Sequence, residues 1–300
     1  MKNIKKYYFL FVVLVLAMIR GSSYLFIKDV ITVYSPFEVV FFRFFLTGIV
    51  LFIFYRKLLA KATKYDVIFG VLAGLFLFSA FAFQTYGLKY TTVSKQSFLT
   101  SLYIVLIPLL NFIFFKEKLQ KAVVAVFSLI LIGLFFISFD NVANLELSFN
   151  YGDFLTLLCA FGFALNIILI SKIAKFEIHI MNITTIQMLS TGLFAFIFQL
   201  IFEKEMISLQ SMNFSLIYLI LICTMLNFTL QNISQKYISA HIMGLILSTE
   251  AIFGTIFAVV FLEEKLNTNF IIGTILITAG VVLVQFFENK KDKVNEHRNR

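Results

Sequence analysis

The sequence predicts an all-α membrane protein, with ten transmembrane helices arranged as two inverted five-helix repeats. Of its 300 residues, 60% are hydrophobic and 14% are charged, whereas soluble domains carry about 25% charged residues. Apolar runs long enough to cross a bilayer recur from one end of the chain to the other. The phrase FFKEKL at 114–119 also returns as FLEEKL at 261–266, which indicates an internal repeat.

Ten apolar runs are expected to span the membrane, because each approaches the length of about 20 residues that a hydrocarbon core of about 30 Å requires. They cover residues 7–28, 36–55, 66–87, 94–115, 121–138, 151–171, 180–202, 215–236, 242–262 and 269–287. Lysines before the first run resemble the charged region of a secretory signal, but no small-residue cleavage site follows. We therefore expect an uncleaved first helix. The short connections leave no room for a soluble domain.

The distribution of lysine and arginine predicts the orientation of the chain. Short cytoplasmic loops of membrane proteins are enriched in these residues. In a ten-span arrangement, the side that holds both termini carries most of the 25 lysines and arginines, including the groups at 56–64, 116–121 and 290–300. Both termini are therefore expected to be cytoplasmic. The net charge of +9 fits this topology and attraction to anionic lipid, so no nucleic-acid partner is inferred.

The two halves of the chain align with one another over long stretches. A shift of 147 positions superposes identical residues: Gln84 with Gln231, Lys89 with Lys236, Ser101 with Ser248, and Glu117 with Glu264. Because each half has an odd number of spans, the second half is expected to enter the membrane upside down. The expected units are a first repeat at 1–139, a second at 151–287 and a basic cytoplasmic tail at 288–300. Such inverted repeats are typical of secondary transporters, whose site lies near the bilayer midplane.

Four stretches give the chain a family resemblance over roughly residues 8–287. GSSYLFIK at 21–28, SPFEVVFFRFFLTG at 35–48, LIPLLNFIFFKEKL at 106–119 and the stretch from STEAIF to GVVLV at 248–284 resemble the EamA-type family of the drug/metabolite transporter superfamily. The resemblance implies an exporter of small metabolites, often amino acids or related compounds, in a bacterial cytoplasmic membrane. Arg20 stands where such proteins often have tryptophan, and Ala251 where proline commonly follows the glutamate.

Three charged residues fall well inside apolar runs: Arg20, Arg43 and Glu250. Inserting such a charged side chain into the centre of a bilayer costs at least about 2.5 kcal/mol, so each of the three residues is a candidate functional residue. In one interpretation Glu250 forms a structural ion pair with Arg43 or Arg20. In another, one arginine binds the carboxylate of an amino-acid-like substrate and Glu250 binds its ammonium group. In a third, Glu250 exchanges a proton that couples transport. Arg20 alternatively reaches outward to water.

Uncharged amides inside the runs form a second group of candidates for substrate binding or coupling. An amide in a bilayer usually bonds a neighbouring helix, because lipid offers it no partner. Most of these residues are therefore expected to hold helices together, and a minority to line a central cavity. They are Gln84, Asn111, Asn166, Gln187, Asn227 and Gln231.

The sequence lacks the common motifs of enzymes and metal sites, which limits the classes of function that it can have. It has no HExxH pair, nucleophile elbow, phosphate loop or Cys/His cluster, so neither an enzyme nor a cofactor or metal is expected. Efflux of cations or drugs is the alternative to metabolite export, and a channel or scaffold is a weaker one. The expected partners are a small-molecule substrate and the lipid bilayer. The sequence leaves open a proton or other ion gradient and a homodimer.

Overall fold

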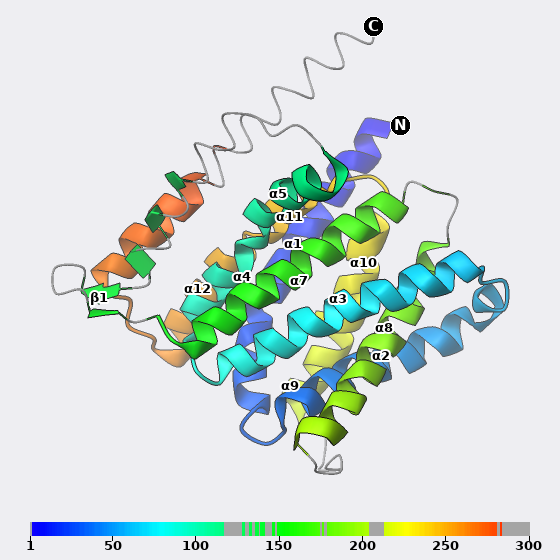
Figure 1. The fold of residues 1–300 in the computed structure, drawn as a ribbon, viewed down its shortest axis with the longest axis horizontal. Helices are drawn as coiled ribbons and strands as arrows, with labels where there is room; N and C mark the ends of the chain where they lie inside the picture. Colours follow the sequence, from blue (N-terminus) through cyan, green and yellow to red (C-terminus); the bar gives the residue numbers. More distant parts are fainter. Residues whose placement is uncertain are drawn as a thin grey trace, which may run out of the picture.

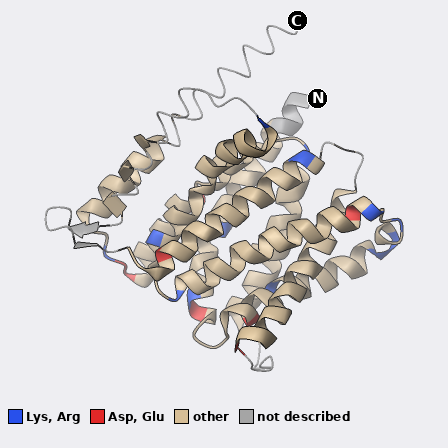
Figure 2. Ribbon diagram, in the orientation of Figure 1, with Lys and Arg blue, Asp and Glu red and all other residues tan. Residues whose placement is uncertain are grey.

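The computed structural model describes residues 2–116, 149–174, 179–203 and 213–280, with residues 176 and 283 and short pieces between 128 and 147. Long helices lie side by side in this part of the chain (Figure 1). Eight of them are long and apolar enough to cross a membrane: Tyr7–Val30, Pro36–Leu59, Lys64–Leu88, Val93–Phe115, Tyr151–Ile173, Ile180–Glu203, Phe214–Ser234 and Ala240–Leu262. Charged residues lie mainly near the helix ends (Figure 2).

The helical elements follow the predicted runs closely. They are α1 (Lys2–Val30), α2 (Pro36–Leu59), α3 (Lys64–Leu88), α4 (Val93–Ser101), α5 (Tyr103–Phe115), α7 (Tyr151–Ile173), α8 (Ile180–Phe198), η1 (Gln199–Glu203), α9 (Phe214–Tyr218), η2 (Leu219–Leu226), α10 (Asn227–Ser234), α11 (Ala240–Leu247) and α12 (Glu250–Leu262). A further apolar helix covers Thr268–Gly280. Most of the predicted run at 121–138, the end of the run at 269–287 and the tail at 288–300 lie outside the described residues.

Two short strands lie in the connection between the halves of the otherwise all-helical structure. β1 (Phe139–Asn141) and β2 (Glu146–Leu147) pair antiparallel, with Phe139 opposite Leu147. They occupy the connection between the two halves, which the sequence analysis assigned no regular structure. This pair lies at the edge of the helical assembly (Figure 1).

Helix starts are fixed by local hydrogen bonding. At α2 the hydroxyl of Ser35 accepts from the backbone N–H of Glu38, whose carboxylate accepts from the N–H of Ser35 in return, at 3.3 and 2.8 Å. The same capping box begins α3 at Thr63 and α7 at Asn150. These reciprocal bonds satisfy amides that the helix itself leaves free.

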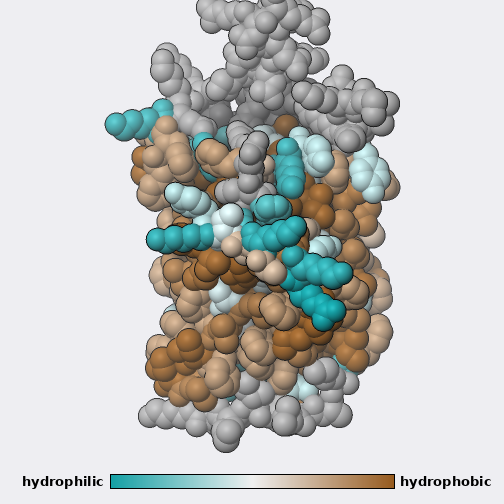
Figure 3. Space-filling view, turned by 90° about the vertical axis from the view of Figure 1, so that its right-hand side faces the viewer, coloured by the Kyte–Doolittle hydropathy of each residue, from teal (hydrophilic) through white to brown (hydrophobic). Residues whose placement is uncertain are grey.

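Figure 3 looks onto the end of the molecule where α2 leads into α3 and shows hydrophilic side chains gathered between hydrophobic ones.

Two of the predicted spans, found at Val93–Phe115 and Ala240–Leu262, are each interrupted by a short turn. The run at 94–115 breaks at Leu102, and the run at 242–262 breaks after Leu247. At the breaks Leu102 donates to the carbonyl of Leu99, and the amide of Thr249 donates to the carbonyl of Ile246. Such bonds tighten a helix locally. The two breaks coincide at a shift of 147 positions, which places Tyr103 and Glu250 at the same point of the two halves.

The ends of the same two spans also match. Lys116 and Glu263 are the only non-glycine residues with positive φ in the described ranges, at 54° and 53°, and they too are 147 positions apart. After this bend the carboxylate of Glu264 accepts hydrogen bonds from the amides of Val93 and Ser94, at 2.9 and 3.1 Å. The phrase EEKL thus ties the end of α12 to the start of α4. The matching phrase in the first half lies outside the described residues beyond Lys116.

Contacts between the halves are reciprocal at α2 and α8. A Cβ on Gly48 would lie 2.9 Å from the backbone nitrogen of Leu189, and one on Gly192 would lie 2.7 Å from that of Phe45. A shift of 144 positions carries Gly48 onto Gly192 and Phe45 onto Leu189. Contacts that exchange partners in this way are those of a two-fold arrangement. Both glycines are needed because a side chain has no room at this crossing.

Replacing Gly192 by valine is expected to lower the free energy of unfolding by about 1–3 kcal/mol, as overpacking of a close contact does. The added carbons would meet the backbone of Phe45, which cannot turn away as a flexible side chain would. Unfolding of detergent-purified protein measures the effect. Leu193→Val is the matched control, since Leu193 is 48% exposed on the same helix. Equal stability of the two variants would contradict the close contact.

Candidate functional site

A small cavity lies inside the helical assembly, among helices of both halves. Its volume is about 10 Å³, which is room for about one water molecule. Charged, polar and aromatic side chains line it together: Arg20, Ser23, Tyr24, Arg43, Phe81, Gln84, Cys223, Phe228 and Glu250. All three charged residues that the sequence placed inside apolar runs therefore meet at one cavity.

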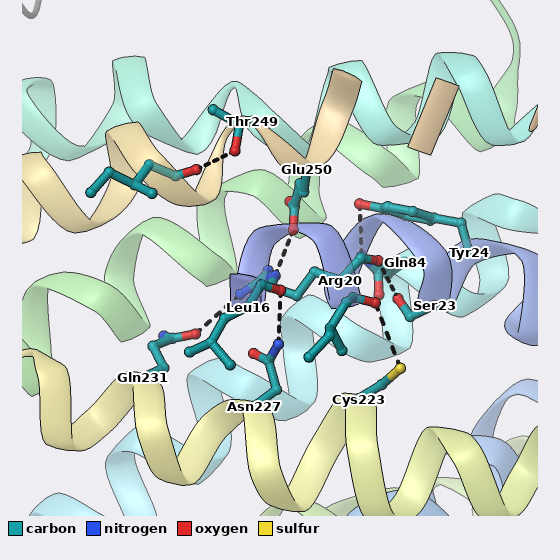
Figure 4. A network of polar contacts seen from close by, with 12 residues as sticks. Leu16, Arg20, Ser23, Tyr24, Gln84, Cys223, Asn227, Gln231, Thr249 and Glu250 are labelled. Carbon is teal, nitrogen blue, oxygen red and sulfur yellow. Dashed lines mark hydrogen bonds and ion pairs between the residues drawn. The ribbon is translucent and has the colours of Figure 1, made fainter. Parts of the chain in front are cut away.

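Arg20 and Glu250 form an ion pair across the two halves. Nε of Arg20 donates to Oε2 of Glu250 at 2.5 Å, and Nη1 donates to Oε1 of Gln231 at 3.2 Å. Figure 4 shows the Arg20 side chain between these partners. The guanidinium also lies 4.8 Å from the ring centroid of Phe163, within cation–π range. Glu250 is the first residue of α12, where the helix dipole favours a negative charge.

This geometry decides between the pairings that the sequence left open. Glu250 pairs with Arg20 and not with Arg43. Arg20 does not reach outward to water, because its exposed fraction is 6%. The pair also engages Oε2 of the carboxylate that was expected to receive a substrate ammonium group, while Oε1 has no hydrogen-bond partner.

Arg43 is buried in a different environment. Its exposed fraction is 1%, its Nε donates to Oγ1 of Thr224 at 3.1 Å, and its guanidinium lies 4.7 Å from the ring centroid of Phe81. Nη1 has no hydrogen-bond partner. Within the described ranges no carboxylate lies within 4.0 Å of this side chain. Arg43 therefore faces the cavity as a cation without a counter-ion.

The partner of Arg43 sits on a π-helical segment. Thr224 lies in η2, and its hydroxyl donates to the carbonyl of Leu219, five residues earlier, at 2.7 Å. The same oxygen accepts from Arg43. Wide turns of this kind often mark functional sites. Here the π-helix also carries Cys223, whose thiol donates to the carbonyl of Ile19 at 3.7 Å.

Of the six candidate amides, Gln84 and Gln231 contact the cavity or its ion pair. Gln84 donates to the hydroxyl of Tyr24 at 3.5 Å. Asn227 lies next to them but bonds the carbonyl of Leu16 at 3.0 Å and so joins α10 to α1 (Figure 4).

The other three amides hold helices together elsewhere. Asn166 donates to the carbonyl of Ala73 at 2.9 Å, and Gln187 accepts from Asn232 at 2.8 Å. Nδ2 of Asn111 lies 3.4 Å from a ring nitrogen of His241. Each contact joins two different helices, which is the packing role expected of most amides in a bilayer.

The sequence analysis missed several residues of the cavity. Ser23, Tyr24, Phe81, Cys223 and Phe228 give no signal in the sequence, because the apolar runs are rich in such residues. The alignment of the two halves could have drawn attention to Tyr103, since it falls on Glu250. Its hydroxyl is buried without a hydrogen bond.

Comparison with known proteins agrees with these features. The sequence matches the EamA-like transporter family twice, over residues 8–139 and 150–286. It is 29% identical over 272 residues to an uncharacterized transporter of Archaeoglobus fulgidus. The aligned region covers 89% of this chain and 82% of that protein. A crystal structure with 16% sequence identity has a TM-score of 0.67 over 93% of this chain and 97% of that one, so the fold is shared. The chain is thus a multi-pass membrane protein that belongs to the EamA-like transporter family.

Proposed function

We propose that the protein is a secondary-active transporter that exports small metabolites, amino acids or related compounds, across a bacterial cytoplasmic membrane by alternating access. The observation that carries the proposal is the cavity, where Arg20 and Arg43 of the first half meet Glu250 of the second. Charges buried at membrane depth are costly and typically mark a substrate or ion pathway. The cavity has room for about one water molecule, so a metabolite would require it to widen during the transport cycle.

The proposed architecture is ten transmembrane helices in two inverted five-helix repeats. It is supported by the two helix breaks and the two positive-φ residues that share one shift of 147 positions. It is also supported by the reciprocal glycine contacts of α2 and α8 and by the two successive family matches. In transporters with inverted repeats, the halves rock about a site near the midplane. The cavity lies between the halves, where such rocking would open it to each side in turn.

Cysteine labelling is expected to place residue 118 on the cytoplasmic side and residue 265 outside. The inverted repeat requires this result because the two residues occupy equivalent positions in oppositely oriented halves. Lys118→Cys and Lys265→Cys are made separately and treated in intact cells with a membrane-impermeant maleimide. The native Cys159 and Cys223 are 0% and 1% exposed, so unmodified protein is the control. Labelling of both variants from the same side would contradict the inverted arrangement.

The function itself is tested by the extracellular metabolite profile of cells that overproduce the protein. The expected result is a rise of a few amino acids or related compounds outside these cells and not outside cells with Arg43→Gln at equal membrane abundance. Because the sequence has no phosphate-binding loop for ATP, export is expected to be driven by an ion gradient. If that ion is the proton, dissipating the proton gradient abolishes the rise. Equal profiles with wild type, variant and empty vector would count against transport of metabolites.

A further inference from the structure

We propose that the substrate of this transporter is a monovalent organic anion, whose carboxylate binds Arg43 and whose body contacts the aromatic side chains of the lining once the cavity opens beyond the room for about one water molecule that it has here. This inference rests on the proposed transport function and shifts its substrate class from zwitterionic amino acids to related compounds that carry one net negative charge. It assigns different roles to the two arginines: Arg20 is a structural cation that is already paired, and Arg43 is the binding cation.

The charges of the cavity lining add up to one unpaired positive charge. Two arginines and one glutamate line it. Arg20 and Glu250 cancel one another at 2.5 Å, which leaves the charge of Arg43. Burying an unpaired ion costs several kcal/mol, so a site of this kind gains most from a ligand of opposite charge. One carboxylate brings the cavity to neutrality, whereas a dianion such as a phosphate ester would leave one negative charge.

The geometry of Arg43 also fits a carboxylate. Nε is held by Thr224 at 3.1 Å, which fixes the plane of the guanidinium, and Nη1 has no hydrogen-bond partner. A guanidinium presents its donors as a rigid fork that matches a carboxylate. The ring of Phe81, with its centroid 4.7 Å from the guanidinium carbon, covers one side of the group. Nη1 is thus a buried donor without a protein acceptor, on a side chain that lines the cavity.

A substrate cation is disfavoured by the same contacts. The sole carboxylate of the lining, Glu250, already accepts from Arg20. Its second oxygen, Oε1, has no hydrogen-bond partner, but an ammonium group placed there would also meet the two arginines of the lining. The α-ammonium group of an amino acid is therefore not required for binding, and a carboxylic acid without it is expected to bind at least as well.

The inference is tested with three small probes of nearly the same shape and different charge: benzoate, benzamide and benzamidine. Detergent-purified full-length protein is heated with each probe at the same concentration and ionic strength. A ligand of the folded state raises the unfolding temperature. We expect benzoate to raise it by about 2 °C or more, and benzamide and benzamidine to leave it unchanged. Arg43→Gln is expected to remove the benzoate effect, and Arg56→Gln, at the exposed end of the same helix, to preserve it.

The outcomes separate this inference from the transport proposal. Stabilisation by benzamidine instead of benzoate, equal effects of the three probes, or a benzoate effect that survives Arg43→Gln would each overturn the anion site. Transport would still stand in these cases if the metabolite profile shows export of neutral or cationic compounds. Conversely, a benzoate effect that depends on Arg43, together with an unchanged metabolite profile, would support the anion site and contradict export from these cells.

Discussion

Replacing Glu250 by glutamine is expected to abolish transport and to destabilise the protein by about 3 kcal/mol, at the lower end of the usual cost of breaking a buried ion pair. The side chain keeps its shape, but Arg20 loses its counter-ion in a cavity that already holds Arg43. A glutamine oxygen still accepts one hydrogen bond, which limits the loss. Thermal and chemical unfolding in detergent measure stability, and metabolite export measures function. Glu263→Gln, the same change at an exposed position, is expected to have little effect.

A double variant distinguishes a coupled ion pair from two independent residues. When Arg20→Gln is combined with Glu250→Gln, no unpaired charge is left by the pair, so the double variant should be more stable than either single variant. If the two losses of stability simply add, the pair makes no coupled contribution and the geometry has been misinterpreted. Recovery of stability without transport would show that the ion pair is needed for the transport cycle as well as for folding.

Replacing Arg43 by glutamine is also expected to impair transport, but in this case the fold should keep its stability. No carboxylate balances Arg43 among the described residues, so removing its charge should leave stability unchanged or raise it. A charge-assisted hydrogen bond is worth about 1.5–3 kcal/mol, which corresponds to about a 10- to 100-fold rise in the KM for an anionic substrate. Export kinetics at equal membrane abundance measure this effect.

Two further variants test whether the geometry of Arg43, and not only its charge, matters for transport: Arg43→Lys and the control Arg56→Gln. Lysine keeps the positive charge but cannot reproduce the planar fork, so an intermediate loss of transport is expected. Arg56→Gln removes an exposed charge from the end of the same helix and should preserve transport. A large loss of stability in Arg43→Gln would assign Arg43 to the structure rather than to the substrate site.

The sequence was sufficient to find the charged residues of the site but not to pair them. Hydropathy identified Arg20, Arg43 and Glu250 because a charge inside an apolar run is costly wherever it points. Counting residues along a helix gives the depth of a side chain in the membrane. It does not give the direction of the side chain around the helix axis, which depends on packing. The choice of Arg20 as the partner of Glu250 therefore needed the structure.

The interrupted helices show a second limit. Leu102 carries no proline or glycine signal, and a continuous apolar run from 94 to 115 reads as one helix. The break becomes visible only from the tertiary structure, where Tyr103 and Glu250 begin new helical segments. By contrast, capped starts such as Ser35 and Asn150 have local signals, a polar side chain followed three residues later by an acid. Boundaries with local causes were predictable, and those with tertiary causes were not.

The ion pair also has a consequence for how the chain is made. Arg20 and Glu250 are separated by 230 positions, and Arg43 and Thr224 by 181. During synthesis, both arginines of the first half thus enter the membrane long before their partners leave the ribosome. Each unpartnered arginine costs about 2.5–3.5 kcal/mol at the centre of a transmembrane helix. The first half alone is therefore less stable in the membrane than it is in the complete chain. The second half completes it, and a ribosome that stalls before Glu250 would leave a nascent chain for membrane quality control to recognise and degrade.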